Sequence, residues 1–233
     1  MTGTTQRKGT SLLLFYHREG AASWLAHLDT MRLFERSLGR ASWPLSWTED
    51  AFNPRPEIVF ALPVGVGIET RRDPVQVTLT TDRGDFQAQE AVQALNDAFP
   101  PGFEVVDYCF CPPGGRSLMA RVSAARYRID APGIGPAWQA VFLSGQPVLV
   151  EHLSKRKRTM IDLAPRLRSL DLLEEDSLIL TAGAGSSDHL RIDLVLDALT
   201  RYGGLQPAAA QGARIIRLEV ILDPEPGDQG IIV

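Results

Sequence analysis

Three arginines recur at four-residue spacing in the stretch HLDTMRLFERSLGRA, as Arg32, Arg36 and Arg40. Apolar residues recur at three- and four-residue spacing on the other side of this stretch, which predicts a helix with one core face and one basic face. Guanidinium groups bind phosphate oxygens, so such a row could contact a polyanion. The alternative is a solvated face on which Asp29 pairs with the cations.

A second basic group is KRKR, which consists of Lys155, Arg156, Lys157 and Arg158. Four consecutive cations repel one another unless an anion is near. The group lies in a stretch expected to form a projecting hairpin, where it could meet a phosphate backbone or another polyanion.

Aromatic and stiff polar residues follow the first basic stretch. Trp43 and Trp47 could stack on bases of single-stranded RNA, or they could cap the end of a core. Asn53 and Arg55 alternate with two prolines in FNPRP, and proline favours extended geometry at itself and at the preceding residue. We expect either a rigid loop or an arm that carries these two side chains to a ligand.

Residues that could catalyse a reaction are few. The chain has no GxGxxG after its first strand, no GxxxxGK[ST], no HExxH and no GxSxG. His27 could act as a general base, although its place near Met31 and Phe34 favours a packed histidine. Cys109 and Cys111 lack a second cysteine pair for a tetrahedral zinc site. We therefore expect no metal and no cofactor.

Length and composition limit the class of protein. A chain of 233 residues with 44% hydrophobic residues can form two modest cores. The net charge of -4 allows a local basic patch but not a basic coat over the whole surface. The apolar run at residues 12–15 is too short for a signal peptide or a membrane span. We therefore expect no attachment to a membrane. The presence of only two cysteines favours a reducing compartment, the cytoplasm.

The hydrophobic pattern predicts the order β-α-β-β-α-β twice. The first set comprises residues 11–16, 27–41, 57–66, 74–81, 85–99 and 103–111, with Asp85 as a helix cap and a turn at 67–73. The second comprises residues 122–131, 134–145, 146–153, 176–184, 187–204 and 213–222, with extra material at 154–175. This pattern predicts an α+β protein of two tandem ferredoxin-like units with antiparallel sheets. We expect domains at 11–116 and 117–222 and a flexible tail at 223–233.

The stretch AHLDTMRLFERSLGRASWPLSWTEDAFNPRPEIVFALPVGVGIET resembles the signature of the radical-SAM-linked proteins, a bacterial domain family of unknown function. That signature runs approximately SHLD, an arginine-rich helix, GFNPHP and PLGVES. Weaker similarity extends through SLMARVSAARYRI, SKRKRTMIDLAPRL and HLRIDLVLDAL. The departures include Ala26 for serine, Ala51 for glycine and Arg55 for histidine, so a role that needs those residues is absent here.

The resemblance implies an accessory role, since such domains are fused to, or encoded beside, a cobalamin-binding radical-SAM protein. With no CxxxCxxC motif, the chain would leave radical chemistry to that partner. Our main hypothesis is a non-catalytic module that binds tRNA or rRNA, or otherwise presents a substrate to the partner. The alternatives are a metal-independent endoribonuclease using His27, by analogy with CRISPR RNA-processing enzymes, and a protein-interaction domain.

Overall fold

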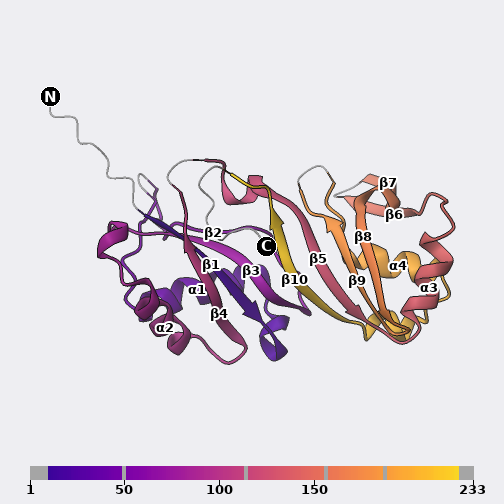
Figure 1. The fold of residues 1–233 in the computed structure, drawn as a ribbon, viewed down its shortest axis with the longest axis horizontal. Helices are drawn as coiled ribbons and strands as arrows, with labels where there is room; N and C mark the ends of the chain where they lie inside the picture. Colours follow the sequence, from indigo (N-terminus) through magenta and orange to yellow (C-terminus); the bar gives the residue numbers. More distant parts are fainter. Residues whose placement is uncertain (1–9, 49–50, 113–114, 155–156, 186–187, 226–233) are drawn as a thin grey trace. The chain divides into compact units, whose positions relative to one another are not determined.

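The computed structural model describes residues 10–48, 51–112, 115–154, 157–185 and 188–225 (Figure 1). These residues form ten strands and five α-helices, and the strand pairs with a determined register are antiparallel, which confirms the expected α+β class. The chain divides into two compact units. Unit 1 comprises residues 1–121 and 222–233, and unit 2 comprises residues 122–221.

Unit 1 contains four strands and two α-helices. In chain order they are β1 (Ser11–Arg18), α1 (His27–Arg40), β2 (Ile58–Phe60), β3 (Ile68–Thr78), α2 (Ala88–Ala98) and β4 (Phe103–Phe110). In the sheet, β1 lies between β4 and β3, and β2 pairs with β3; all three pairings are antiparallel. This arrangement is compatible with a ferredoxin-like unit.

The core of unit 1 explains how α1 is oriented. Alternate residues of β1, among them Leu14 and Tyr16, join Phe34 and Leu38 of α1 in one buried cluster. The Phe34 ring meets Tyr16 edge-on at a centroid distance of 4.9 Å and Phe60 at 5.2 Å. Because the apolar residues of α1 recur every three or four positions, the opposite face of this helix is left to solvent.

A fully buried arginine holds the start of α1 against the sheet. Arg18, at the end of β1, donates from one terminal nitrogen to the Leu25 carbonyl at 3.1 Å and to Thr30 Oγ1 at 3.3 Å. Its other terminal nitrogen donates to the carbonyls of Gly65 and Ile68, both at 2.8 Å. The planar fork of arginine can serve these separate acceptors at once, so one side chain joins β1, α1 and the turn before β3.

Two expectations for unit 1 were wrong. Residues 67–73, expected as a turn, include the first six residues of β3. Arg71 and Arg72 in this part are only partly buried and pair with Glu19 and Asp107, so a strand accommodates the charges. The second helix starts at Ala88 with Gln87 at its N-cap position, while Asp85, the expected cap, ends a short 3-10 turn.

Unit 2 contains the remaining strands and helices. They are β5 (Val122–Asp130), α3 (Ile134–Phe142), β6 (Leu149–Ser154), β7 (Lys157–Asp162), β8 (Leu167–Glu174), β9 (Ser177–Gly183), α4 (Ile192–Tyr202), α5 (Pro207–Gln211) and β10 (Arg214–Leu222). The strand order β10-β5-β9-β8 matches the order in unit 1. It is likewise compatible with a ferredoxin-like unit.

The second strand of this unit is not the segment that we expected. The pattern assigned the place to residues 146–153, but β6 pairs with β7 in a separate hairpin. The place beside β9 is taken by β8, from the stretch expected to be extra material. Most residues of β8 are exposed, so its sequence lacks the apolar alternation by which half-buried strands are recognised.

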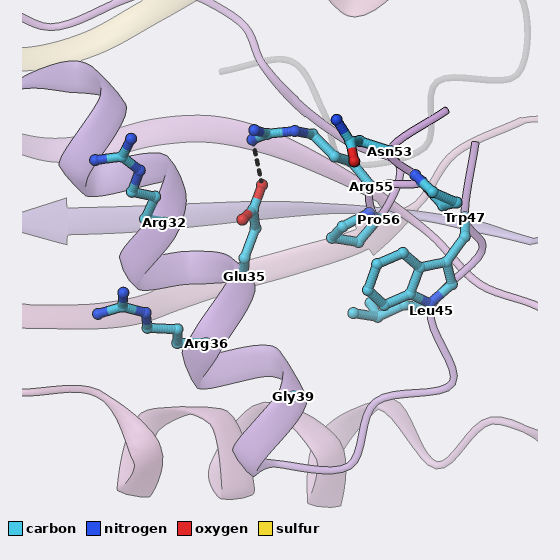
Figure 2. A pocket seen from close by; sticks show the side chains of 10 residues that line it. Arg32, Glu35, Arg36, Gly39, Leu45, Trp47, Asn53, Arg55 and Pro56 are labelled. Carbon is cyan, nitrogen blue, oxygen red and sulfur yellow. Dashed lines mark ion pairs between the residues drawn. The ribbon is translucent and has the colours of Figure 1, made fainter. Parts of the chain in front are cut away.

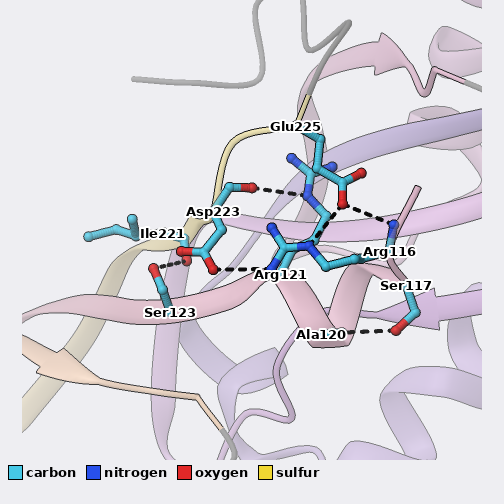
Figure 3. A network of polar contacts seen from close by, with 8 residues as sticks. All are labelled: Arg116, Ser117, Ala120, Arg121, Ser123, Ile221, Asp223 and Glu225. Carbon is cyan, nitrogen blue, oxygen red and sulfur yellow. Dashed lines mark hydrogen bonds and ion pairs between the residues drawn. The ribbon is translucent and has the colours of Figure 1, made fainter.

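The end of the described chain returns to unit 1 (Figure 3). Glu225 accepts hydrogen bonds from the backbone N–H of Arg116 at 2.9 Å and from its Nε at 3.0 Å. These bonds, the backbone one first, lower the pKa of the Glu225 carboxyl. Asp223 pairs with the same guanidinium at 3.3 Å, and its backbone N–H donates to the Arg121 carbonyl at 2.7 Å. The sequence predicted a domain boundary between residues 116 and 117 and a flexible tail at residues 223–233. Residues 226–233 of that tail lie outside the described part of the chain.

No helix in the described part of the chain is long and apolar enough to span a membrane.

Candidate functional site

A pocket of about 530 Å³ lies on unit 1 between α1 and the segment that follows it (Figure 2). It is lined by Arg32, Glu35, Arg36 and Gly39 from α1, and by Leu45, Trp47, Asn53, Pro54, Arg55 and Pro56. The pocket therefore joins the exposed face of α1 to the segment with two prolines.

Backbone pairing brings this segment back onto α1. The chain turns at Ser42, whose φ of 56° lies in the left-handed region. Trp47 and Pro56 then form an isolated antiparallel bridge, and the Thr48 N–H donates to the Arg55 carbonyl at 2.9 Å. The Arg55 N–H returns a bond to Thr48 Oγ1 at 3.0 Å. This pairing places Trp47 beside Pro56 and brings Arg55 to α1.

The three guanidinium groups of the pocket differ in their partners. Arg32 lies 3.4 Å from Asp29, a contact between two exposed side chains that contributes little. Among the residues that the structure describes, Arg36 is exposed and has neither an ion-pair nor a hydrogen-bond partner. Arg55 lies 3.6 Å from Glu35. In Figure 2, Arg32 and Arg36 project to the same side of α1, and Glu35 points towards Arg55.

An aromatic surface forms the other side of the pocket. Trp47 is 53% exposed, so part of its indole ring is accessible to a ligand. Figure 2 shows its indole next to Pro56, with Leu45 beneath and Asn53 on the same arm. The site therefore offers guanidinium groups for an anion on one side of α1, at Arg32 and Arg36, and a surface for a flat ring at Trp47.

Two other predicted residues lie elsewhere in unit 1. Arg40 donates to the Ala98 carbonyl at 2.6 Å and to Ser37 Oγ at 3.0 Å, so its guanidinium is directed to the end of α2. Trp43 is only 6% exposed, and its Nε1 donates to the Ala91 carbonyl at 3.0 Å. The core-capping alternative therefore describes Trp43, which is too buried to stack on a base.

His27 does not lie among the residues that line the pocket. Its half-buried ring meets the Phe60 ring edge-on at a centroid distance of 5.5 Å. Within the described ranges, no group of three or more His, Cys, Asp or Glu side chains is placed to hold a metal ion.

The second basic group lies on the β6–β7 hairpin of unit 2. Lys155 and Arg156 fall outside the described residues, and the backbone of Lys157 begins β7 opposite Ser154. The exposed Arg158 lies 3.4 Å from Glu151 on the other strand. Arg158 is therefore already paired within the hairpin.

Glu35 is the charged pocket residue that the sequence reasoning missed. It stands within the arginine row, but it takes the side of α1 that faces the arm, as Figure 2 shows. Glu35 comes three residues after Arg32 and one before Arg36, so it lies at an edge of the arginine face. Its partner Arg55 stands 20 positions further along the chain, so only the return of that segment onto α1 reveals the pair.

A family model described as an uncharacterized protein conserved in bacteria (DUF2344) matches residues 12–192. The chain belongs to this family. The DUF2344 match begins in β1 and ends at the first residue of α4, so it contains the whole pocket and the β6–β7 hairpin. No curated protein matches the chain.

A surface histidine of this DUF2344 chain lies among cations in unit 2. The Arg166 guanidinium donates to the His189 carbonyl at 2.9 Å. Partial desolvation, and then the charges of Arg217, Arg191 and Arg166, lower the pKa of His189 below its ordinary 6.5, against a backbone hydrogen bond with Ala184 that raises it. The imidazole is therefore neutral in the folded protein near pH 7.

We expect stability to fall as the solution is acidified through the folded-state pKa of His189. A depressed pKa means that the unfolded chain binds the proton at a higher pH than the folded one. The contribution of the neutral imidazole to the free energy of unfolding is therefore complete above pH 6.5 and is lost as the pH falls through the folded-state pKa. An NMR titration of the imidazole should give a midpoint below 6.5, moving up to the ordinary value in urea. A native midpoint at or above the urea value would contradict this prediction.

Proposed function

We propose that the pocket of unit 1 binds single-stranded RNA, such as an exposed segment of a tRNA or rRNA. The observation that supports this proposal is the half-exposed Trp47 in a pocket that Arg32 and Arg36 also line. A base stacks on an aromatic ring while guanidinium groups neutralise the adjacent phosphates, and this combination is typical of proteins that bind single strands.

The arm between α1 and β2 suits this role. Asn53 is exposed on it and could hydrogen-bond to a base edge. The backbone pairing of Trp47 with Pro56, together with the two prolines, fixes these described residues before a ligand arrives. Residues held in place in this way lose less conformational entropy on binding than mobile ones would. The net charge of -4 restricts RNA to local basic surfaces.

We further propose that the protein is a non-catalytic accessory module that presents RNA to a separate radical-SAM enzyme. The resemblance of residues 26–70 to the radical-SAM-linked signature supports this role. The chain has only two cysteines, fewer than the three in the cluster motif of such enzymes, so the partner would carry out the reaction. The position of His27 against Phe60, outside the pocket, does not favour the ribonuclease alternative.

The salt dependence of binding tests the phosphate contacts. We expect the double variant Arg32→Ala/Arg36→Ala to flatten the log-log plot of affinity against salt by about 1.4 units, at about 0.7 per phosphate contact on a single strand. The measurement is fluorescence anisotropy of a labelled twelve-nucleotide RNA over a range of salt concentrations.

The matched control removes two arginines from unit 2. Arg126 and Arg128 lie on β5 and pair with Glu219 and Asp130, so Arg126→Ala/Arg128→Ala changes the net charge equally without touching the pocket. We expect this control to retain the original slope. Equal slopes in both double variants and the unaltered protein would overturn the proposed phosphate site.

A further inference from the structure

A carboxylate lies inside a pocket whose other charged groups are cations. The side chain of Glu35 is 26% exposed, and its Oε1 lies 3.6 Å from a terminal nitrogen of Arg55. A pocket built only to bind phosphate would gain from the absence of this negative charge. Glu35 therefore points to a ligand that also presents hydrogen-bond donors.

The spacing of Glu35 and Arg55 leaves both groups able to bind a ligand. At 3.6 Å, the two side chains are too far apart for a hydrogen bond. Both oxygens of Glu35 can still accept, and the guanidinium of Arg55, whose side chain is 65% exposed, can still donate. The pocket thus offers two acceptors beside a fork of donors, next to the Trp47 ring.

We propose that this pocket selects guanine as the base that stacks on Trp47, an inference that rests on the proposed RNA binding. Guanine presents two neighbouring donors, N1–H and the N2 amino group, and next to them the two acceptors O6 and N7. A carboxylate fits the donor pair and an arginine fits the acceptor pair. In a single strand both edges of the base are accessible to side chains.

The other bases match this order of groups poorly. Adenine places its N1 acceptor towards the carboxylate and its N6 amino donor towards the guanidinium. Cytosine likewise places an acceptor at N3, and uracil has a single donor between two acceptors. A donor that faces a donor, or an acceptor that faces an acceptor, loses its hydrogen bond when the base covers it, and this loss is the source of discrimination. Arg32 and Arg36 project from another side of α1 in Figure 2 and would contact phosphate whatever the base.

The test compares three short RNAs, UUUGUU, UUUAUU and UUUUUU, by fluorescence anisotropy at one salt concentration. No strand carries more than one guanine, because runs of guanine would make the strands associate with one another. We expect the unaltered protein to bind UUUGUU about tenfold more tightly than UUUAUU, which is within the discrimination of one bidentate pair. In Glu35→Gln this ratio should fall to about one, since an amide has one acceptor and adds a donor.

The matched control is Glu57→Gln, on the same arm but outside the lining of the pocket, and it should keep the preference. Equal binding of all three RNAs by the unaltered protein, with the salt dependence intact, would overturn guanine selection and leave the RNA site standing. An absence of binding to any of them would overturn both. An equal loss for every RNA in Glu35→Gln, with a lower melting temperature, would assign Glu35 a structural role and overturn the inference.

Discussion

Replacement of Arg18 by leucine is expected to lower the free energy of unfolding of unit 1 by about 3 to 5 kcal/mol. The substitution removes the donor of three partly buried hydrogen bonds, to the carbonyls of Leu25, Gly65 and Ile68, and a carbonyl left without a partner away from water costs about 1–3 kcal/mol. Arg18→Lys should lower the free energy of unfolding by an intermediate amount, since a single ammonium group cannot reach the acceptors of both terminal nitrogens of the arginine. Urea unfolding followed by tryptophan fluorescence measures this change, because three of the four tryptophans lie in unit 1.

Arg71→Leu is the matched control for Arg18. Arg71 lies on β3 of the same sheet, but its side chain is 38% exposed and pairs with Glu19 and Glu69 at the surface. Ion pairs of this kind contribute about 0–1 kcal/mol, so its loss should be small. If Arg18→Leu cost no more than Arg71→Leu, the buried hydrogen bonds would not hold the start of α1.

The role of Arg18 extends to the candidate site. Its bonds to Leu25 and Thr30 fix the beginning of α1, the helix that carries Arg32 and Arg36. Loosening this end would let the helix shift relative to the arm that carries Trp47. We therefore attribute to Arg18 the positioning of the pocket, although it touches no ligand.

The second large effect concerns Trp47. We expect Trp47→Ala to weaken RNA binding by about 5- to 150-fold, which corresponds to the 1–3 kcal/mol of one base stacked on an aromatic side chain. Trp47→Phe should keep most of the affinity because a flat ring remains. Fluorescence anisotropy with the twelve-nucleotide RNA measures both variants at fixed salt concentration.

Trp24 provides the control for Trp47. It is also in unit 1 and is 71% exposed, but it does not line the pocket. We expect Trp24→Ala to bind RNA as the unaltered protein does. Equal weakening by the two substitutions, or none by either, would show that Trp47 is not the stacking surface.

Much of the fold follows from local patterns in the sequence. The apolar spacing in residues 27–41 predicts α1 within one residue of its observed bounds, His27–Arg40, because one stripe of a helix must face the core. The patterns failed at β3 and β8. In β3, charged residues pair at a partly buried surface, and in β8 most residues are exposed, so neither shows the alternation of a half-buried strand.

The sequence by itself determined that Arg32 and Arg36 share a helix face, since a four-residue spacing is a local property of the helix. Only the tertiary structure separated Trp43, which the core buries, from Trp47, which stays exposed. It also placed Glu35 against Arg55. Both outcomes depend on where the chain after α1 folds back, and contacts between residues distant in sequence decide that path.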